Sequence, residues 1–504
     1  MIDVGERIAE VFAQGGDAPA LEQHGVWYRW SDLQAVGNGV AAALEQAGLQ
    51  APGTRIGMLL RNRPALFAAA LGVIRCNACI VTLNPELPSL PLAEDIEAQA
   101  PPVLLADPQD WARPEVLAVA AKIGALGLSV AFTPAGKVVL QQMSSPSMAA
   151  LWRERSAGVV IEMLSSGTTG KPKRIRLERD KLNQSLWTGS LYETPDPSKV
   201  IVKPIATIHV APLVHIGGLW SSLYNLYNGR QLALLERFEV DRWHELVLQH
   251  RPKFAALPPS ALRMVLERNY PRADFETLVA IRSGTAPVDP SLIVAFRDRY
   301  GVAVLDTYGA TEFAGGVAGW TMRVFRACWD AKRGSVGRAN TGVELRIVDR
   351  DTFAVLAPDA AGLLEVKSEQ IGSEKGWVRT ADLAKIDADG FLFILGRADS
   401  VINRGGFKIA PERVQAALAE HPAIRDAAVV GIADERLGQV PVAAIELAAD
   451  QVFPGADALK TFLRTRLKPY EIPVSYRVVA ALPRTPSQKV SQPSVRALFD
   501  GSQR

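Results

Sequence analysis

The sequence of 504 residues has few cysteines, no long run of charge of one sign and no long uninterrupted hydrophobic run. Three cysteines in a chain of this length are compatible with a reducing compartment. The 56 lysines and arginines nearly balance the 53 aspartates and glutamates, which gives a formal net charge of +3. Charge therefore predicts affinity neither for nucleic acid nor for a membrane surface.

Two of the cysteines, Cys76 and Cys79, form a Cys-x-x-Cys pair, but there is no second pair to complete a zinc site. A redox pair is the alternative interpretation. The pair lies between a helix-like run at 68–74 and a strand-like run at 80–83. We therefore expect both cysteines to pack in a core.

Neither a signal peptide nor a transmembrane helix is expected. The first six residues lack a basic region and an apolar core. The longest apolar stretch, at 116–132, is interrupted by Lys122, by glycines and by Ser129. These features predict a cytoplasmic protein without integral membrane association.

Apolar runs that suit buried strands alternate with helical patterns, which predicts an α/β fold with mostly parallel sheets. The alternation is clearest at 55–60, 65–74 and 80–83, where a strand, a helix and a strand follow one another. Because 504 residues exceed what a single core usually holds, at least two domains are expected.

We predict a large N-terminal body and a smaller C-terminal cap. The body spans residues 1–396, consists of sheets flanked by helices, and includes a small β subdomain at about 335–396, where short strand-like runs are separated by Asp/Gly turns. The cap spans residues 397–504 and is predicted to be a mobile α+β domain, with helices near 411–421 and 456–467.

The most informative segment is the run Ser-Ser-Gly-Thr-Thr-Gly-Lys-Pro-Lys at 165–173, directly after a strand-like stretch. Its glycines let the backbone turn with N–H groups outward, its hydroxyls are donors and its lysines supply positive charge, all of which suit phosphate binding. It is not a Walker A loop, because only two residues separate its glycines and Pro172 occupies the Ser/Thr position. Taken alone, the run has a flexible surface turn as its alternative interpretation.

The run resembles the signature of the adenylate-forming superfamily, which contains acyl-CoA and aryl-CoA synthetases, luciferases and the adenylation domains of peptide synthetases. Five further motifs follow in the family's order, whereas the first 150 residues fit the family only loosely. The motifs are Tyr308-Gly309-Ala310-Thr311-Glu312, Thr380-Ala381-Asp382, Gly396-Arg397-Ala398-Asp399, Gly405-Gly406-Phe407-Lys408-Ile409-Ala410-Pro411-Glu412 and Pro483-Arg484-Thr485-Pro486-Ser487-Gln488-Lys489.

The resemblance implies that these motifs bind ATP and coenzyme A. Asp382 resembles the ribose-binding aspartate, because a carboxylate can accept hydrogen bonds from two vicinal hydroxyls, and Arg397 resembles its ribose and phosphate partner. Thr311 would face the α-phosphate, and Tyr308 would stack near adenine, which the turn Gly284-Thr285-Ala286-Pro287 would line. The residues implied in nucleotide and coenzyme A binding are Ser165, Ser166, Gly167, Thr168, Thr169, Gly170, Lys171, Lys173, Gly284, Thr285, Ala286, Pro287, Tyr308, Gly309, Asp382, Arg397, Gly405, Gly406 and Lys408.

The resemblance also implies a site for pyrophosphate and Mg²⁺. Thr168, Thr169 and Lys173 would hold the β- and γ-phosphates. Glu312, with help from Thr168, would place Mg²⁺, because this hard cation takes oxygen ligands and usually keeps its phosphates and waters. An ordinary exposed acid is the alternative interpretation of Glu312.

Lys489 is the residue that we expect to act in adenylation. Its ammonium, on a flexible stem carried by the mobile cap, can bridge the attacking carboxylate and the α-phosphate as charge builds in the transition state. In the family, the cap then rotates about a hinge residue, which falls here on Asp399. Gly405, Gly406 and Lys408 would then line the pantetheine tunnel. A solvated lysine and an ordinary polar turn are the alternatives.

His215 aligns with a histidine beside the substrate carboxylate in many of the synthetases. A satisfied core histidine is the alternative. Apolar residues at 220–224 and 257–262 suggest an apolar pocket. Amino-acid-activating relatives place an aspartate at the opening of this segment, and none occurs from 211 to 223, which argues against an amino-acid substrate.

We therefore predict an acid–thiol ligase that joins a small apolar carboxylic acid, aryl or acyl, to coenzyme A through an acyl-adenylate. The implied catalytic residues are Lys489, Thr311, Glu312 and His215. Acyl transfer to a carrier-protein phosphopantetheine is the nearest alternative, and a luciferase-like oxygenase is a second. A non-catalytic nucleotide-binding relative is the alternative from another class, and the intact motif residues argue against it. A homodimer is left open.

Three residues depart from the family's pattern. Arg174 adds a charge next to the phosphate loop that would tighten pyrophosphate binding or alter the path of the loop. Ala381 replaces a glycine before Asp382, which implies a negative φ there. Gln488 replaces a glycine before Lys489, which implies a less free lysine loop.

Overall fold

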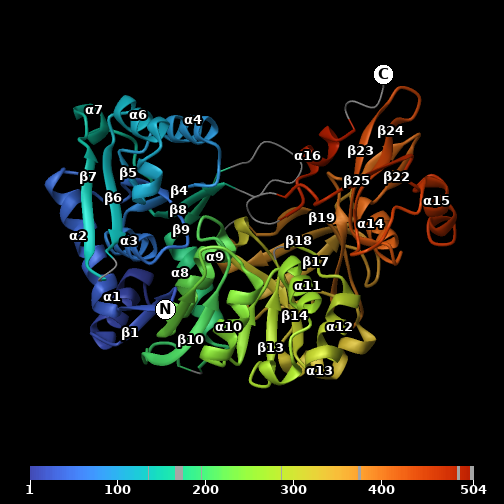
Figure 1. The fold of residues 1–504 in the computed structure, drawn as a ribbon, viewed down its shortest axis with the longest axis horizontal. Helices are drawn as coiled ribbons and strands as arrows, with labels where there is room; N and C mark the ends of the chain where they lie inside the picture. The colour runs from blue at the N-terminus through green and yellow to red at the C-terminus, as the bar shows by residue number, and fades with distance from the viewer. Residues whose placement is uncertain are drawn as a thin grey trace. The chain divides into compact units, whose positions relative to one another are not determined.

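The computed structural model describes residues 1–133, 136–164, 174–194, 196–284, 286–372, 376–484 and 489–499. The chain divides into two compact units. Among the described residues, the first unit comprises 1–164, 174–317 and 368–372, and the second comprises 318–367 and 376–499. Helices and parallel sheets alternate in the first unit, and the predicted α/β class is confirmed (Figure 1).

A seven-stranded sheet in the order β7-β6-β5-β3-β4-β8-β9 forms part of the first unit. The five inner strands are parallel, whereas β7 and β9 run antiparallel to their neighbours at the two edges. The strands are β3 (Arg55–Leu59), β4 (Cys79–Leu83), β5 (Val103–Ala106), β6 (Leu126–Phe132), β7 (Val138–Ser144), β8 (Val159–Leu164) and β9 (Arg174–Glu178).

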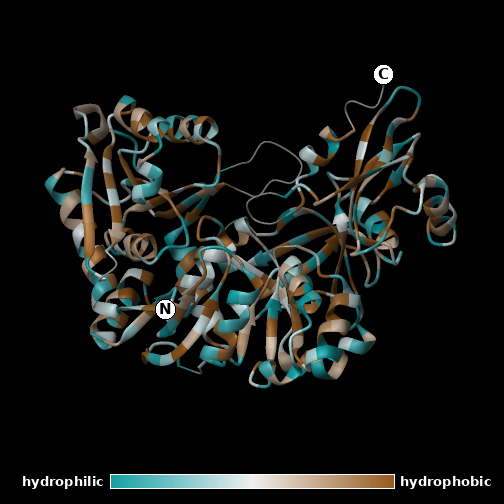
Figure 2. Cartoon of the chain, viewed as in Figure 1, coloured by the Kyte–Doolittle hydropathy of each residue, from teal (hydrophilic) through white to brown (hydrophobic). Residues whose placement is uncertain are grey.

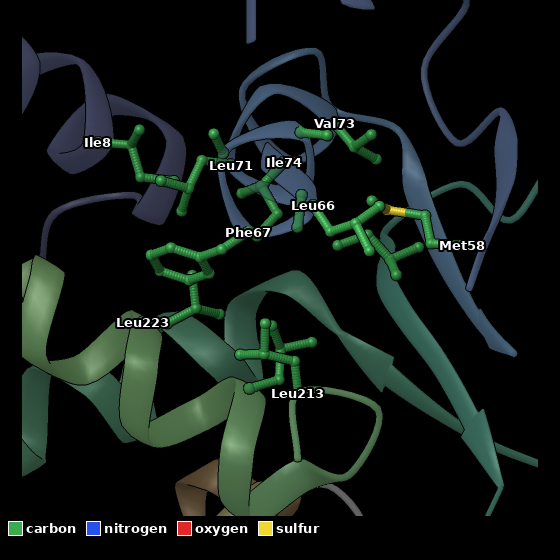
Figure 3. Close-up of a cluster of buried hydrophobic side chains, with 14 of the residues drawn as sticks. Ile8, Met58, Leu66, Phe67, Leu71, Val73, Ile74, Leu213 and Leu223 are labelled. Carbon is green, nitrogen blue, oxygen red and sulfur yellow. The ribbon is translucent and has the colours of Figure 1, made fainter. Parts of the chain in front are cut away.

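Helices cover both faces of this sheet. Side chains alternate along β3, so Met58 packs in one buried cluster with α1 (Val4–Gly15), α2 (Trp30–Gln46) and α3 (Pro64–Arg75), whereas Leu59 packs in another with α4 (Ser89–Gln99) and α6 (Pro114–Lys122). Figure 3 shows the first cluster, in which α1 and α3 meet Leu223 of α9 (Ile216–Tyr227). Hydrophobic and hydrophilic residues alternate along many of the helices (Figure 2), as expected for helices that bury one face.

The close contact between α2 and α3 depends on two glycines. A Cβ at Gly72 would lie only 2.5 Å from the Gly37 Cα. The two helix backbones therefore touch at this point, where no larger side chain fits.

Two further sheets complete the first unit. One has the order β10-β11-β1-β2, with a β1–β2 hairpin and parallel pairing elsewhere, and the other contains the parallel strands β12, β13 and β14, followed by β15. Their strands are β1 (Pro19–Gln23), β2 (Val26–Arg29), β10 (Lys203–His209), β11 (Arg230–Leu234), β12 (Phe254–Ala256), β13 (Ala280–Ser283), β14 (Ala303–Ala310) and β15 (Gly315–Gly319). The remaining helices here are α5 (Pro108–Trp111), α7 (Met148–Leu151), α8 (Arg179–Ser190), α10 (Val240–His250), α11 (Pro259–Arg268), α12 (Pro290–Tyr300), η1 (Arg272–Phe275), η2 (Thr311–Phe313) and η4 (Glu369–Ile371).

The second unit contains a sheet in the order β17-β18-β19-β20 and a sheet in the order β22-β21-β24-β23, with β25 beside β24. Its strands are β16 (Arg338–Ala339), β17 (Val343–Val348), β18 (Gly362–Ser368), β19 (Val378–Ile386), β20 (Leu392–Arg397), β21 (Ile402–Arg404), β22 (Phe407–Ile409), β23 (Ile424–Asp434), β24 (Gly438–Leu447) and β25 (Ser475–Val479). Its helices are α13 (Met322–Cys328), η3 (Trp329–Ala331), α14 (Pro411–Ala419), α15 (Ala456–Arg464) and α16 (Gln492–Ala497).

The compact units differ in extent from the domains expected from the sequence. The strands of the expected β subdomain, β17 to β20, group with the elements that follow them. The predicted division into domains at 1–396 and 397–504 stays a prediction. No helix in the described ranges is long and apolar enough to cross a membrane.

The two cysteines of the Cys-x-x-Cys pair are free thiols. Cys79 is buried, and burial raises the pKa of its thiol to about 12. A thiol with so high a pKa supplies little thiolate at neutral pH. The core-packing interpretation therefore fits Cys79 better than the redox interpretation, whereas Cys76 is only half-buried, so the expectation that both cysteines pack in a core is confirmed for Cys79 alone.

Candidate active site

Two predicted adenine-binding motifs lie side by side in the first unit. β13 and β14 are parallel, with Ser283 opposite Asp306, so Gly284 follows β13 next to Thr307. A Cβ at Gly284 would lie 2.6 Å from the Thr307 Oγ1, and the same hydroxyl donates to the Ser283 carbonyl at 2.9 Å. Tyr308 comes next on β14. Ligands of open α/β sheets bind at such carboxyl ends of parallel strands.

The other residues of these motifs have varied environments. Ala286 is half-buried and Pro287 is exposed, whereas Thr285 lies outside the described residues. Gly309 is required by packing, because a Cβ there would lie 2.4 Å from the Gly315 carbonyl oxygen.

Asp306, which the sequence analysis did not single out, is a buried acid between these motifs. Its side chain is 6% exposed, and the Thr307 N–H donates to its Oδ1 at 2.8 Å. Burial raises the pKa of this carboxyl to about 8. At neutral pH the group is therefore mostly protonated, which makes Asp306 a hydrogen-bond donor as well as an acceptor.

Thr311 and Glu312 lie on the short helix η2, which two buried side chains hold in place. The Gln370 amide donates to the Phe313 carbonyl at 2.8 Å, and the Ser185 hydroxyl donates to the Ala314 carbonyl at 2.7 Å. Glu312 is exposed, which fits both a metal ligand and the ordinary exposed acid that is its alternative interpretation, so its metal role stays a prediction. No three His, Cys, Asp or Glu side chains in the described part of the chain form a cluster that could hold a metal ion.

His215 is half-buried and forms the N-cap of α9. Its N–H donates to the Pro212 carbonyl at 3.1 Å, which closes the turn before the helix. A different histidine, His209 at the end of β10, is the one that fills a core position. Its Nε2 lies 3.1 Å from the Ser222 hydroxyl, and burial lowers its pKa to about 4, so this ring stays neutral at physiological pH.

An aromatic pair follows on α9. Trp220 and Tyr224 stack with their ring centroids 5.0 Å apart, and the Trp220 indole donates to the Ser185 hydroxyl at 2.9 Å. Burial raises the pKa of the Tyr224 phenol, whose oxygen is 3.1 Å from the Glu193 carboxylate. Both rings are half-buried and pack against the core of the first unit, so their positions on α9 are fixed.

In the second unit, Asp382 and Arg397 lie directly opposite each other on the neighbouring strands β19 and β20. The Arg397 guanidinium is 3.5 Å from the Asp382 carboxylate and also makes two hydrogen bonds, at 2.9 and 2.7 Å, to Asp399. Arg397 thus links the predicted ribose-binding acid to the predicted hinge residue. Ala381 lies within β19 without a positive φ, as expected from its replacement of glycine.

Glu412 is a half-buried acid of this region, named in the sequence analysis only as the last residue of its motif. A Cβ at Gly396 would lie 2.5 Å from its Oε2, so the glycine makes room for the carboxyl. Burial raises the pKa of this carboxyl, and the nearby positive charge of Arg397 opposes that rise.

Gly405 and Gly406 form the turn of the hairpin between β21 and β22. Both have positive φ values, of 55° and 87°, which is typical of a two-residue hairpin turn. Lys408 is exposed on β22. The turn geometry alone therefore accounts for both glycines, and their role in coenzyme A binding stays a prediction.

Lys489 is half-buried and adjoins Val490, which pairs with Arg484 in an antiparallel bridge. Gln488 lies outside the described residues.

The predicted phosphate-binding residues also lie outside the described residues; they are Ser165, Ser166, Gly167, Thr168, Thr169, Gly170, Lys171 and Lys173. The strands that flank them are described, and Leu164 pairs with Arg174. The Arg174 guanidinium makes two hydrogen bonds to the Asp95 carboxylate, each at 2.9 Å, and one to the Thr82 carbonyl at 3.0 Å. Its charge is therefore neutralised by Asp95, which argues against the expected effect on pyrophosphate and favours a role in the path of the chain.

Two models of known protein families match the chain. The model of the AMP-binding enzyme family matches residues 8–374, and that of the AMP-binding enzyme C-terminal domain matches residues 413–489. The chain belongs to the AMP-binding enzyme family. The resemblance to the adenylate-forming superfamily is thereby confirmed.

Known relatives of this AMP-binding enzyme include 4-coumarate–CoA ligase 3 of Oryza sativa subsp. japonica, which is 29% identical over 97% of this chain and 90% of that protein. Among solved structures, ATP-bound MatB from Rhodopseudomonas palustris has a TM-score of 0.81, is 24% identical and covers 99% of both chains. The amide bond synthetase McbA from Marinactinospora thermotolerans has a TM-score of 0.80, is 26% identical and covers 99% of this chain and all of its own. The fold is thus that of adenylate-forming enzymes over the full length.

Three residues that hold parts of the site were missed by the sequence analysis, namely Asn62, Ser185 and Gln370. Each is a buried polar residue that donates a hydrogen bond to a backbone carbonyl far away in the sequence. No local pattern marks such a residue.

Proposed function

We propose that the protein is an ATP-dependent ligase that joins a carboxylic acid to coenzyme A through an acyl-adenylate. Membership of the AMP-binding enzymes and the similarity to 4-coumarate–CoA ligases support an acid–thiol ligase. The observation that carries the proposal is the pairing of Asp382 with Arg397 across neighbouring strands. The pairing supports the proposal because a carboxylate that could accept from two ribose hydroxyls lies beside a cation that could bind phosphate.

In the first half-reaction, a carboxylate oxygen attacks the α-phosphorus of ATP and pyrophosphate leaves. The adenine would lie by Gly284 and Tyr308, at the carboxyl ends of β13 and β14. Thr311 would donate to the α-phosphate, and the Lys489 ammonium would stabilise the negative charge that develops there. Glu312 and Thr168 would hold Mg²⁺, an ion that offsets the charge of a leaving pyrophosphate when it is bound.

In the second half-reaction, the coenzyme A thiol attacks the acyl carbonyl and AMP leaves. We propose that the segment after Asp399 rotates, so that the turn at Gly405 and Gly406 faces the thiol in place of Lys489. Arg397 supports this assignment, because its guanidinium bonds both Asp382 and Asp399. A change in the backbone at Asp399 would therefore alter the position of Arg397 beside Asp382.

The acid is proposed to be an apolar one with an aryl or acyl chain. His215 would lie beside its carboxylate, and the stacked Trp220 and Tyr224 would meet its apolar part. Aromatic side chains favour aryl acids, because offset stacking of two rings adds to the binding free energy gained from burial of apolar surface. Hydroxycinnamic acids such as 4-coumarate are the first choice because of the relatives' names.

The test is acid-dependent release of pyrophosphate over a panel of hydroxycinnamic, benzoic, short-chain, medium-chain and polycyclic acids, with and without coenzyme A. The proposal predicts release with at least one acid and formation of AMP and acyl-CoA when coenzyme A is added. No release with any acid would favour a non-catalytic relative. Release without transfer to coenzyme A would favour another acceptor, such as a carrier protein or an amine.

A further inference from the structure

Asn62 lies between β3 and α3, and its side chain makes three hydrogen bonds to distant segments. Its Nδ2 donates to the carbonyls of Ala211 and Leu235, each at 3.0 Å, and its Oδ1 accepts from the Leu213 N–H at 2.8 Å. Only this orientation of the amide suits two carbonyls and one N–H. Asn62 is 4% exposed, so water cannot replace these bonds.

The segment that Asn62 holds leads directly to His215. Ala211 and Leu213 flank Pro212, whose carbonyl accepts the His215 N–H. The same carbonyl oxygen is so close to Gly218 that a Cβ there would lie 2.0 Å away. A shift of residues 211–213 would therefore shift both His215 and the first turn of α9.

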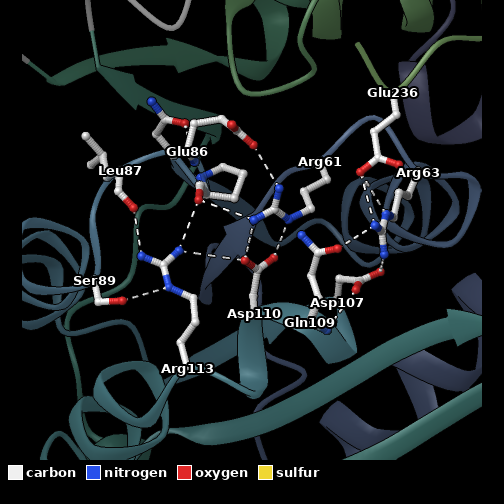
Figure 4. A network of polar contacts seen from close by, with 12 residues as sticks. Arg61, Arg63, Glu86, Leu87, Ser89, Asp107, Gln109, Asp110, Arg113 and Glu236 are labelled. Atoms are coloured by element: carbon white, nitrogen blue, oxygen red, sulfur yellow. Dashed lines mark hydrogen bonds and ion pairs between the residues drawn. The ribbon is translucent and has the colours of Figure 1, made fainter.

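The residues on either side of Asn62 fix its backbone (Figure 4). The Arg61 guanidinium makes two hydrogen bonds, at 2.8 and 2.7 Å, to a fully buried carboxylate, and Arg63 bridges two acids that follow different strands. The acids that hold the two arginines are Glu86, Asp107, Asp110 and Glu236. Asn62 is thus a fixed point from which the segment before His215 is held.

We propose that Asn62 is a positioning residue for the acid-binding segment 211–215. The inference rests on the proposed function, in which His215 lies beside the substrate carboxylate. The segments bonded by Asn62 follow β10 and β11, whereas the adenine motifs follow β13 and β14. Loss of these bonds should therefore weaken acid binding and spare ATP binding.

The test is Asn62→Asp, which keeps the size of the side chain and its acceptor for Leu213 but turns a carboxylate oxygen toward two carbonyls. Neither Arg61 nor Arg63 can neutralise the new charge without leaving its present acids. We expect the KM for the best acid of the panel to rise at least about tenfold, since two buried acceptors lose their donor. The KM for ATP should stay within about twofold of the wild-type value, because its site does not move.

The matched control is Asn183→Asp. Asn183 is also a buried asparagine, 5% exposed, and its amide donates to the Asp3 carboxylate at 3.0 Å and accepts the Val4 N–H at 2.9 Å. This change should lower stability without changing the KM for the acid. A folded Asn62→Asp with an unchanged acid KM, or with equal rises in both KM values, would overturn the inference.

If Asn62→Asp does not fold, Asn62→Ser replaces it, since a hydroxyl can still make one of the two donations. An intermediate rise in the acid KM is then expected. Failure of both variants to fold would identify Asn62 as a general folding residue and overturn the inference. Wild-type protein that releases no pyrophosphate would overturn the proposed function, and this inference with it, whereas an active wild type with an unaffected variant would overturn the inference alone.

Discussion

Replacing Arg174 with alanine should destabilise the protein and weaken ATP binding while leaving acid binding unchanged. Arg174 is the first residue of β9, immediately after the predicted phosphate loop. Its two hydrogen bonds to Asp95 join the start of β9 to α4, and a third bond reaches the Thr82 carbonyl on β4. Without them the start of β9 loses its connection to two neighbouring elements.

The magnitude follows from burial and geometry. The side chains of Arg174 and Asp95 are 14% and 17% exposed, so the pair lies between a surface ion pair, worth less than about 1 kcal/mol, and a buried one, whose disruption costs about 3–5 kcal/mol. We therefore expect Arg174→Ala to cost about 2 kcal/mol in the free energy of unfolding. Asp95→Asn should cost less, because the amide can still accept one hydrogen bond from the guanidinium.

The assay is a double-mutant cycle measured by urea unfolding, together with the KM values for ATP and for the acid. The coupling between the two positions should be about 1 kcal/mol or more, and the KM for ATP should rise severalfold in Arg174→Ala. Arg176→Ala is the control, since Arg176 lies on the same strand but is 54% exposed and is 3.6 Å from its acid, Glu162. A coupling near zero, or a KM for ATP that changes no more than in the control, would refute the reasoning.

Three further predictions follow from single residues. Because the pKa of Asp306 is raised to about 8, the folded protein holds a proton that the unfolded chain loses near pH 4, so stability should fall as pH rises from 4 to 8 by up to about 1.4 kcal/mol per unit. Asp306→Asn should remove this slope in unfolding curves measured from pH 5 to 8, and an unchanged slope would disprove the assignment. Gln370→Ala removes the bond to the Phe313 carbonyl and should raise the KM for MgATP about threefold or more without changing that for the acid; equal effects on both would point to general loosening. Lys489→Ala should slow acyl-adenylate formation at least about a hundredfold and largely spare thioester formation from supplied acyl-adenylate, and equal losses would exclude its assigned role.

Much of the fold was accessible from the sequence because the inner strands are short apolar runs bounded by glycine, proline and charged residues. The segments at 55–60, 65–74 and 80–83 match β3, α3 and β4 to within one residue at each end. β19 and β24 were harder to recognise. β19 carries the Thr380-Ala381-Asp382 motif, whose polar residues obscure the strand pattern, and β24 alternates only weakly because both of its faces are buried.

The site was predictable to the extent that its residues lie in contiguous motifs. Asp382 and Arg397 were found as motif residues, but their pairing across two strands depends on register, which the sequence does not display. The environment of Asp306 and the bonds of Asn62 depend on segments far away in the chain. The ion pair of Arg174 could not be predicted from the sequence either, because Asp95 lies on α4, 79 positions before Arg174.

The central claim, that the acid is activated as an acyl-adenylate, is tested most directly with an acid labelled with ¹⁸O in its carboxylate. The acid, ATP and coenzyme A are incubated with the protein, and the released AMP is examined by mass spectrometry. Attack of the carboxylate on the α-phosphorus followed by cleavage of the acyl–oxygen bond predicts one ¹⁸O atom in each AMP. Unlabelled AMP, or label in inorganic phosphate with ADP as the other product, would contradict the account.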